Sequence, residues 1–205
     1  MNPLKFIHIT KNAGTSIENA GKAKGLQWGI YHTEYGLGHI TPDSGWHHEV
    51  TTRLPLSLIN QYDWFMVVRN PYTRILSEYH CKWGGPPASS TLGPMNFLKH
   101  NKQKLKESMN EYLIQKIRNA PAEGHHYTPQ ALYLHPTAKI HVLKFENLQA
   151  EFNALMATYG IEGLVLKREN SREKRFRISD FSRELIALIN EVYHEDFVRF
   201  GYRKL

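Results

Sequence analysis

A turn with one lysine and several small residues follows the first apolar stretch of the chain, residues 4–9. This run of apolar residues predicts a buried strand, and the amphipathic pattern over 16–24 predicts a helix after the turn. The free N–H groups and the positive dipole end of such a helix start favour an anion. We therefore predict an anion-binding turn formed by Lys11, Asn12, Ala13, Gly14, Thr15 and Ser16.

The same turn allows a second interpretation. Thr15 and Glu18 have the spacing of a capping box, which would only start the helix. Lys11 favours ligand binding, because a plain helix cap needs no lysine, and Gly14 lets a ligand approach the backbone closely. The pattern G-x-x-x-x-G-K-[ST] occurs nowhere in the chain, so an ordinary ATPase or kinase is not the first choice.

A second strand-to-helix junction lies at Arg69. The preceding run, residues 64–68, is apolar without a break and predicts a central strand buried on both faces. Pro71 suits the first position of a helix over 71–82, because its missing N–H would have no partner there. Arg69 therefore closes a buried strand, at the sheet edge where ligands of open α/β sheets bind.

The helix after Pro71 carries polar side chains on one face. Arg74, Ser77 and Glu78 are spaced three and four residues apart, so they share that face. The ordinary alternative is that Arg69 pairs with a carboxylate and that Ser77 is an incidental helix residue. An arginine that closes a buried strand is harder to explain in this way than one on an exposed helix.

Length and composition limit the class of protein. A chain of 205 residues, 41% hydrophobic and 22% charged, predicts one globular domain over residues 1–205. The only cysteine is Cys81, no secretory signal is visible and no apolar run reaches a membrane span, so we expect a cytoplasmic protein. The net charge of +7 predicts an anionic partner, but no nucleic-acid-binding or metal-binding motif is present.

The remaining elements are predicted from apolar periodicity and turn residues. They are strands over 26–31 and 139–145, helices over 56–60, 95–101, 105–119, 130–134, 146–159 and 181–193, loops over 32–46, 84–93, 120–129 and 167–177, and an aromatic segment over 193–202.

Taken together, the two junctions resemble the nucleotide-binding elements of the sulfotransferase family. Residues 11–16 resemble its 5′-phosphosulfate loop, and residues 67–79 resemble its 3′-phosphate-binding strand and helix. The match is most similar to the branch of carbohydrate (heparan and chondroitin type) sulfotransferases, and it continues through Pro129-Gln130, residues 145–148 and residues 193–202. Thr10 and Asn12 depart from the family, which often has proline and threonine or serine there.

The resemblance implies an α/β three-layer sandwich with a central parallel sheet, similar to P-loop NTPases. It also implies the donor 3′-phosphoadenosine-5′-phosphosulfate (PAPS), with PAP as product. Lys11, Gly14, Thr15 and Ser16 would hold the 5′-phosphosulfate, and Arg69 and Ser77 the 3′-phosphate. In the basic segment 167–177, Arg172 with Lys174 and Arg175 would close over the nucleotide.

The resemblance further implies transfer of the sulfuryl group to an acceptor hydroxyl, of a carbohydrate in that branch. Lys11 would stabilise the leaving phosphate. Related enzymes carry a histidine or glutamate base between the two cofactor elements, where this chain has His47, His48 and Glu49. We assign the base to His48 and keep the other two as reserves; surface or structural histidines are the alternative.

Two other functions remain open at this point. One is an ATP-dependent phosphotransferase, which would need a divalent metal and lacks a Walker lysine. The other is a non-catalytic binder of nucleotides or acidic glycans, which would use the basic surface alone. Neither the acceptor nor the oligomeric state can be read from the residues.

Overall fold

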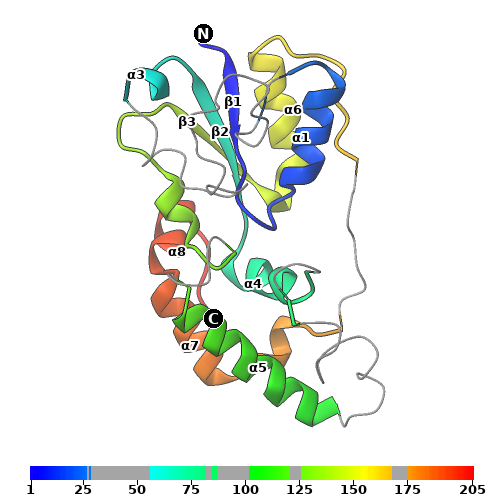
Figure 1. Ribbon diagram of the computed structural model, residues 1–205, viewed down its shortest axis with the longest axis vertical. Coiled ribbons are helices and arrows are strands. Elements are labelled where there is room, and N and C mark those ends of the chain that lie inside the picture. Colours follow the sequence, from blue (N-terminus) through cyan, green and yellow to red (C-terminus); the bar gives the residue numbers. More distant parts are fainter. Residues whose placement is uncertain (27, 29–55, 82–84, 87–101, 121–125, 168–174) are drawn as a thin grey trace. The chain divides into compact units, whose positions relative to one another are not determined.

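The computed structural model describes residues 1–26, 28, 56–81, 85–86, 102–120, 126–167 and 175–205. Contacts group the chain into two units, which are considered separately (Figure 1). The first comprises Met1–Arg69 and Gln130–Ser171, and the second Asn70–Pro129 and Arg172–Leu205. Each unit has a hydrophobic core of its own.

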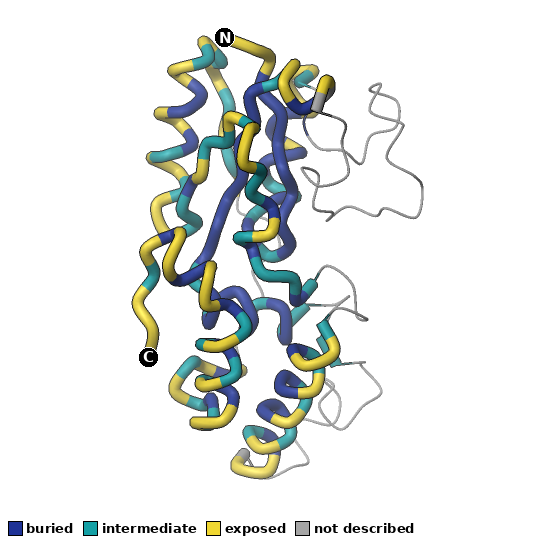
Figure 2. The backbone as a smooth tube through the Cα atoms, turned by 90° about the vertical axis from the view of Figure 1, so that its left-hand side faces the viewer, coloured by how far each residue is buried: buried dark blue, intermediate teal, exposed yellow. Residues whose placement is uncertain are grey.

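A parallel three-stranded sheet organises the first unit, in the order β1-β2-β3. Its strands are β1 (Leu4–Ile7), β2 (Asp63–Val68) and β3 (Ile140–Lys144). Every residue of the central strand β2 is buried, and the tube is continuously buried along β1 and β2 in Figure 2. The predicted α/β class, the parallel sheet and the buried central strand are thereby confirmed.

Two helices, α1 (Gly14–Ala23) and α6 (Leu148–Thr158), cover one face of this sheet (Figure 1). Side chains alternate between the faces of a strand, so Phe65 and Val67 of β2 point to the same side. There they share a core with Ile17 of α1 and Phe152 of α6. Burial of these side chains fixes the helices that follow β1 and β3 against the sheet.

Short elements complete the first unit. They are α3 (Leu56–Ile59) and the 3₁₀ helices η4 (Gln130–Tyr133) and η5 (Phe145–Asn147). The predicted helix over 146–159 is thus a 3₁₀ turn followed by α6. Of the strand predicted over 26–31, only Leu26 and Trp28 are described, and neither lies in a strand.

The second unit is helical. Its elements are α4 (Pro71–Tyr79), α5 (Lys102–Arg118), η6 (Ile178–Asp180), α7 (Arg183–Val192) and α8 (His194–Phe200). Helix α5 packs beside α7 (Figure 1), and apolar residues of both, such as Met109 and Leu185, form the core with Tyr79 and Phe197. No helix among the residues described is long and apolar enough to cross a membrane.

Two helix boundaries differ from the prediction. Helix α4 begins at Pro71 as expected but ends at Tyr79, where His80 Nδ1 donates to the Leu76 carbonyl at 2.7 Å. The segment over 193–202, predicted only as aromatic, contains α8, which follows α7 after the single residue Tyr193. Gly201, with φ of 66°, ends α8 in the left-handed conformation that glycine favours, and this signal could have predicted the helix.

A polar network ties together the starts of β2 and β3. Asp63, buried at the first position of β2, accepts hydrogen bonds from Lys139 Nζ at 2.7 Å and from the Tyr159 hydroxyl at 2.5 Å. Burial alone would raise the pKa of the Asp63 carboxyl, but the bonds from Lys139 and Tyr159 outweigh it and hold the pKa below its ordinary value. The ionised form of Asp63 therefore stabilises the folded state.

This network predicts a pH-dependent stability. Because the folded pKa of Asp63 is depressed, its contribution is complete above the ordinary value of 3.8 and is lost as the pH falls through the folded pKa. At about pH 7, Asp63→Asn should lower the free energy of unfolding by about 1–2 kcal/mol. Urea unfolding down to about pH 3 should show this gap closing.

The exposed Glu162→Gln change in the same unit is the matched control and should leave the free energy of unfolding almost unchanged. A gap between wild type and Asp63→Asn that stays constant over the whole pH range would contradict this role of the Asp63 carboxylate.

Candidate anion-binding site

The turn between β1 and α1 has an unusual backbone. Lys11 and Ala13 have φ values of 65° and 64°, in the left-handed region that residues with a Cβ rarely adopt. Such a conformation persists only where the surroundings fix it, and it is concentrated at ligand-binding turns. The strain at Lys11 and Ala13 therefore supports the interpretation of the turn as a binding element.

The start of α1 has no side-chain cap. Its N-cap, Ala13, offers no side-chain acceptor, and the first turn contains no acidic residue. The first intrahelical bond runs from Ile17 N to Ala13 O at 3.2 Å, so the preceding N–H groups of Gly14, Thr15 and Ser16 have no intrahelical acceptor. An anion above these groups would also meet the positive end of the helix dipole.

The capping-box interpretation of Thr15 and Glu18 is wrong. Thr15 lies inside the helix instead of at its N-cap, because α1 already begins at Gly14. Glu18, which would have to turn back to the helix start, accepts a hydrogen bond from His8 Nδ1 at 2.9 Å. Both members of this His8–Glu18 pair are buried, so it ties the end of β1 to the first turns of α1.

Gly14 is needed for packing at the start of α1. A Cβ atom at this position would lie 2.0 Å from Nε2 of His8, far inside van der Waals contact. The helix start therefore packs directly on the imidazole ring of His8. The sequence predicts that Gly14 lets a ligand approach the backbone. Its packing on His8 is a second reason for glycine at this position.

The side chain of Asn12 is turned inward. It is 1% exposed, and its Nδ2 donates at 2.7 Å to the Val67 carbonyl and at 2.7 Å to Oε1 of Gln130. Its Oδ1 is buried and accepts no hydrogen bond from the residues described. Asn12 thus ties the turn to the end of β2, and only its backbone could serve a ligand above the turn.

Arg69 comes from the end of β2 and reaches the turn that follows β1. Its Nη1 donates to the Lys11 carbonyl at 3.1 Å, and its guanidinium lies 4.1 Å from the centre of the Phe145 ring. A cation over an aromatic face is held electrostatically, so Phe145 and the Lys11 carbonyl fix the direction of the side chain. The Arg69 guanidinium is therefore held against the backbone of the turn that carries Lys11.

The donor set suits an anion. No carboxylate among the residues described lies within ion-pair distance of the Lys11 amine, so its charge is not neutralised by them. Lys11, the three N–H groups of the helix start and the Arg69 guanidinium together offer positive charge and hydrogen-bond donors. A phosphate or sulfate ester matches this chemistry.

In the second unit, the predicted polar face of α4 is used mainly inside the protein. Arg74 is 1% exposed and donates to the carbonyls of Thr128 at 2.8 Å and His126 at 3.3 Å. Glu78, completely buried, accepts from His126 Nδ1 at 2.9 Å. Ser77, by contrast, is half-buried, so of these three side chains it is the most accessible to a ligand.

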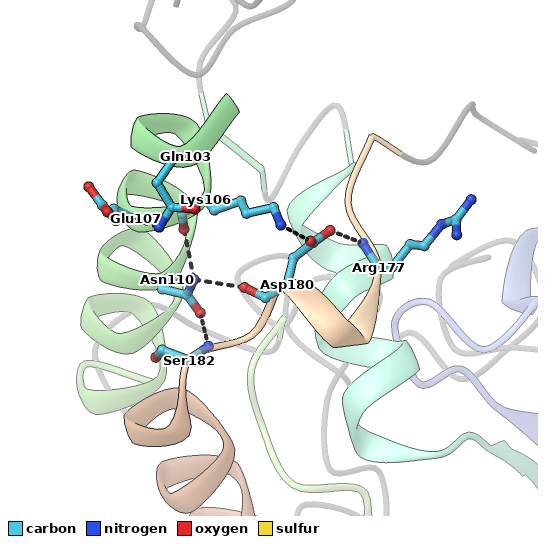
Figure 3. Close-up of polar contacts among 7 residues, drawn as sticks. All are labelled: Gln103, Lys106, Glu107, Asn110, Arg177, Asp180 and Ser182. Atoms are coloured by element: carbon cyan, nitrogen blue, oxygen red, sulfur yellow. Dashed lines mark hydrogen bonds and ion pairs between the residues drawn. The ribbon is translucent and has the colours of Figure 1, made fainter. Parts of the chain in front are cut away.

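The C-terminal end of the basic segment 167–177 is anchored within the second unit. The backbone N–H of Arg175 donates to His80 Nε2 at 3.1 Å, and that of Arg177 donates to Asp180 Oδ2 at 2.9 Å. Figure 3 shows Asp180 paired in turn with Lys106 of α5, at 2.6 Å.

Asn110 of α5 completes this anchor (Figure 3). Its Nδ2 donates to the Asp180 carbonyl at 3.0 Å, and its Oδ1 accepts from Ser182 N at 2.7 Å. Lys106 is therefore engaged in an ion pair within the second unit.

Several predicted site residues lie outside the residues described. These are His47, His48 and Glu49, the candidates for the base, and Arg172 and Lys174, the candidates for closure over the nucleotide; the loops over 32–46 and 87–93 and the helix over 95–101 lie outside as well. Their roles stay predictions.

Three residues of the site were given no role from the sequence. Gln130 and Phe145 belong to the quoted family motifs, but only the fold shows that they contact Arg69. His8 precedes the turn within an apolar run, where a polar residue about to be buried is itself a signal of a specific partner.

The geometry describes an α/β protein whose two neighbouring strand ends offer hydrogen-bond donors and positive charge suited to an anion. Comparison with known families makes this specific. A model described as "Sulfotransferase family" matches residues 38–203, which is most of the chain, so the chain belongs to the sulfotransferase family. The match includes Arg69 and Ser77 and begins after the Lys11 turn. No curated protein and no solved structure shows significant similarity to the chain.

The packing of Gly14 on His8 gives a prediction. Gly14→Ala should lower the free energy of unfolding by about 1–3 kcal/mol, because the new methyl group must displace a buried ring that Glu18 also holds. In thermal or urea unfolding, His8→Ala should cost less in the Gly14→Ala background than in the wild type, since it removes the clash. Strictly additive effects of the two changes would contradict this contact.

Proposed function

We propose that this sulfotransferase-family protein uses PAPS as donor and transfers the sulfuryl group to a hydroxyl, in the manner of the carbohydrate branch. The observation that carries the proposal is the hydrogen bond from the Arg69 guanidinium, at the end of β2, to the backbone carbonyl of Lys11, in the turn after β1. Two cations at neighbouring strand ends suit a nucleotide that carries an anionic group at each end.

The residues present fit this donor. Lys11, the N–H groups of Gly14, Thr15 and Ser16 and the hydroxyls of the last two would hold the 5′-phosphosulfate. Arg69 would hold the 3′-phosphate together with Ser77 of α4, which the family resemblance assigns to the same group. Arg172 would close over the nucleotide from the basic segment. The proposal treats residues 1–205 as one sulfotransferase domain.

The proposed roles of these residues account for the transfer chemistry. When bound, PAPS supplies the sulfuryl group and leaves as PAP. The Lys11 ammonium stabilises negative charge on the departing phosphate. His48 takes the proton of the acceptor hydroxyl, with His47 and Glu49 as the reserve candidates. A cytoplasmic location, predicted from composition, stays a prediction.

Thermal shifts with PAP, AMP, ATP and ATP with magnesium separate this proposal from the phosphotransferase alternative. We expect PAP to raise the melting temperature most, because a ligand that binds only the folded state stabilises it in proportion to its affinity. A larger shift with ATP and magnesium would favour the phosphotransferase. A PAP shift without turnover of labelled PAPS on a library of hydroxyl acceptors would favour a non-catalytic binder.

The role of Arg69 predicts a change in nucleotide preference. Arg69→Ala should weaken PAP binding and leave AMP binding almost unchanged, because only PAP carries the 3′-phosphate. By calorimetry we expect the preference for PAP over AMP to fall by about tenfold or more. Arg203→Ala, at an exposed position, is the control. An unaltered preference in Arg69→Ala would rule out this role.

The catalytic roles predict two different patterns of loss. Lys11→Ala should lower turnover by about 10²-fold or more, the usual scale for a group that stabilises developing charge. Lys22→Ala, at an exposed position of the helix α1 that follows the turn, is the control. His48→Ala should bind PAP normally but lose transfer, measured with labelled PAPS. Retained transfer in His48→Ala would move the base to His47 or Glu49, and near-normal turnover in Lys11→Ala would rule out the lysine role.

A further inference from the structure

Gln130 is a buried polar residue that the proposed chemistry does not use. It opens η4 and is completely buried, although its amide can form several hydrogen bonds. A buried amide is costly unless those bonds are made. In this unit its Oε1 accepts from Arg69 N at 2.8 Å and from Asn12 Nδ2 at 2.7 Å, and its Nε2 donates to Arg69 O at 2.9 Å.

The contact with Arg69 has two points. One side-chain amide binds both the N–H and the C=O of the same residue, as a neighbouring strand would, so both peptide groups that flank the Arg69 Cα are fixed. The paired register of β2 with β3 ends at Val68 and Lys144, one residue before this contact. Gln130 therefore holds Arg69 at the point where the sheet itself no longer does.

The same amide also holds the turn after β1. Its Oε1 is shared with Asn12, whose Nδ2 also donates to Val67 O in β2. The backbone of Lys11, next in sequence to Asn12, accepts from the Arg69 guanidinium. One buried side chain thus connects the two elements that carry the proposed cations.

We propose that Gln130 is the positioning residue that sets where Arg69 meets the nucleotide, and hence that it determines selectivity for a 3′-phosphate over a 2′-phosphate. This inference rests on the proposed function, since it concerns the same nucleotide. An arginine binds a phosphate through a planar guanidinium whose N–H donors have fixed directions. A small displacement of its backbone therefore misaligns these hydrogen bonds with the phosphate but does not change the positive charge. Selectivity between two isomers of equal charge is then lost, while general attraction to the anion remains.

The test compares adenosine 3′,5′-bisphosphate (PAP) with adenosine 2′,5′-bisphosphate, which carry the same charge. In the wild type we expect the 3′,5′ isomer to bind at least about tenfold more tightly in calorimetry. Gln130→Met keeps the length of the side chain and removes its hydrogen bonds. It should bring the ratio of the two dissociation constants close to unity. A variant that is merely less folded would weaken both ligands equally and leave this ratio unchanged.

Two further variants complete the experiment. Gln149→Met makes the same change at an exposed position of α6 and should keep the wild-type ratio. Gln130→Glu, for use if Gln130→Met does not fold, keeps the shape and both acceptor contacts but cannot donate to Arg69 O when ionised. It should also lower the ratio, and its added charge acts on both isomers alike.

The outcomes separate the inference from the proposed function. A wild-type ratio retained in Gln130→Met, or in Gln130→Glu where that variant replaces it, overturns the role of Gln130 and leaves PAP binding intact. A wild type that binds both isomers equally overturns the inference alone. A wild type that binds neither isomer overturns the proposed function, and the inference with it.

Discussion

The site depends on which groups form hydrogen bonds with the backbone where the three parallel strands stop pairing. The paired register of β1 and β2 ends at Ile7 and Met66. That of β2 and β3 ends at Val68, the residue before Arg69. Beyond these points, buried N–H and C=O groups still need partners. Asn12 and Gln130 supply them, through side-chain amides that bind Val67 O and both backbone groups of Arg69. The cations at these strand ends can therefore be held in place without further sheet.

Some elements of this fold can be predicted from short stretches of the sequence alone. Residues 64–68 are apolar without interruption, so a buried central strand follows whatever the rest of the chain does. Pro71 marks the start of α4 through a property of its own backbone. The class of fold and the two junctions could be predicted for this reason. The contact of Asn12 with Gln130 could not, because it joins residues 118 positions apart.

The errors have the same origin. Thr15 and Glu18 have capping-box spacing, but Glu18 instead meets His8, which only the packing of α1 on β1 brings close. Helix α4 ends before the predicted residue 82 because the His80 ring is used in other contacts. Its Nδ1 donates to the Leu76 carbonyl, and its Nε2 accepts from the backbone N–H of Arg175, far along the chain. Arg74 and Glu78, grouped with Ser77 by helical spacing, bind the segment at His126 and Thr128. Periodicity identifies a shared face but does not say whether it meets a ligand or the protein itself.

The chain leaves the first unit after Arg69 and re-enters it at Gln130. These two residues are hydrogen-bonded to each other, so the residues that flank the segment 70–129 are held together. The entropic cost of bringing the two ends of such a segment together grows only with the logarithm of its length. Changes of length in the connections between its helices should thus cost little and leave the contact between Arg69 and Gln130 unmoved. Such connections can then vary in length while α4, which carries Ser77, and the two hydrogen-bonded endpoints keep their places in the sequence.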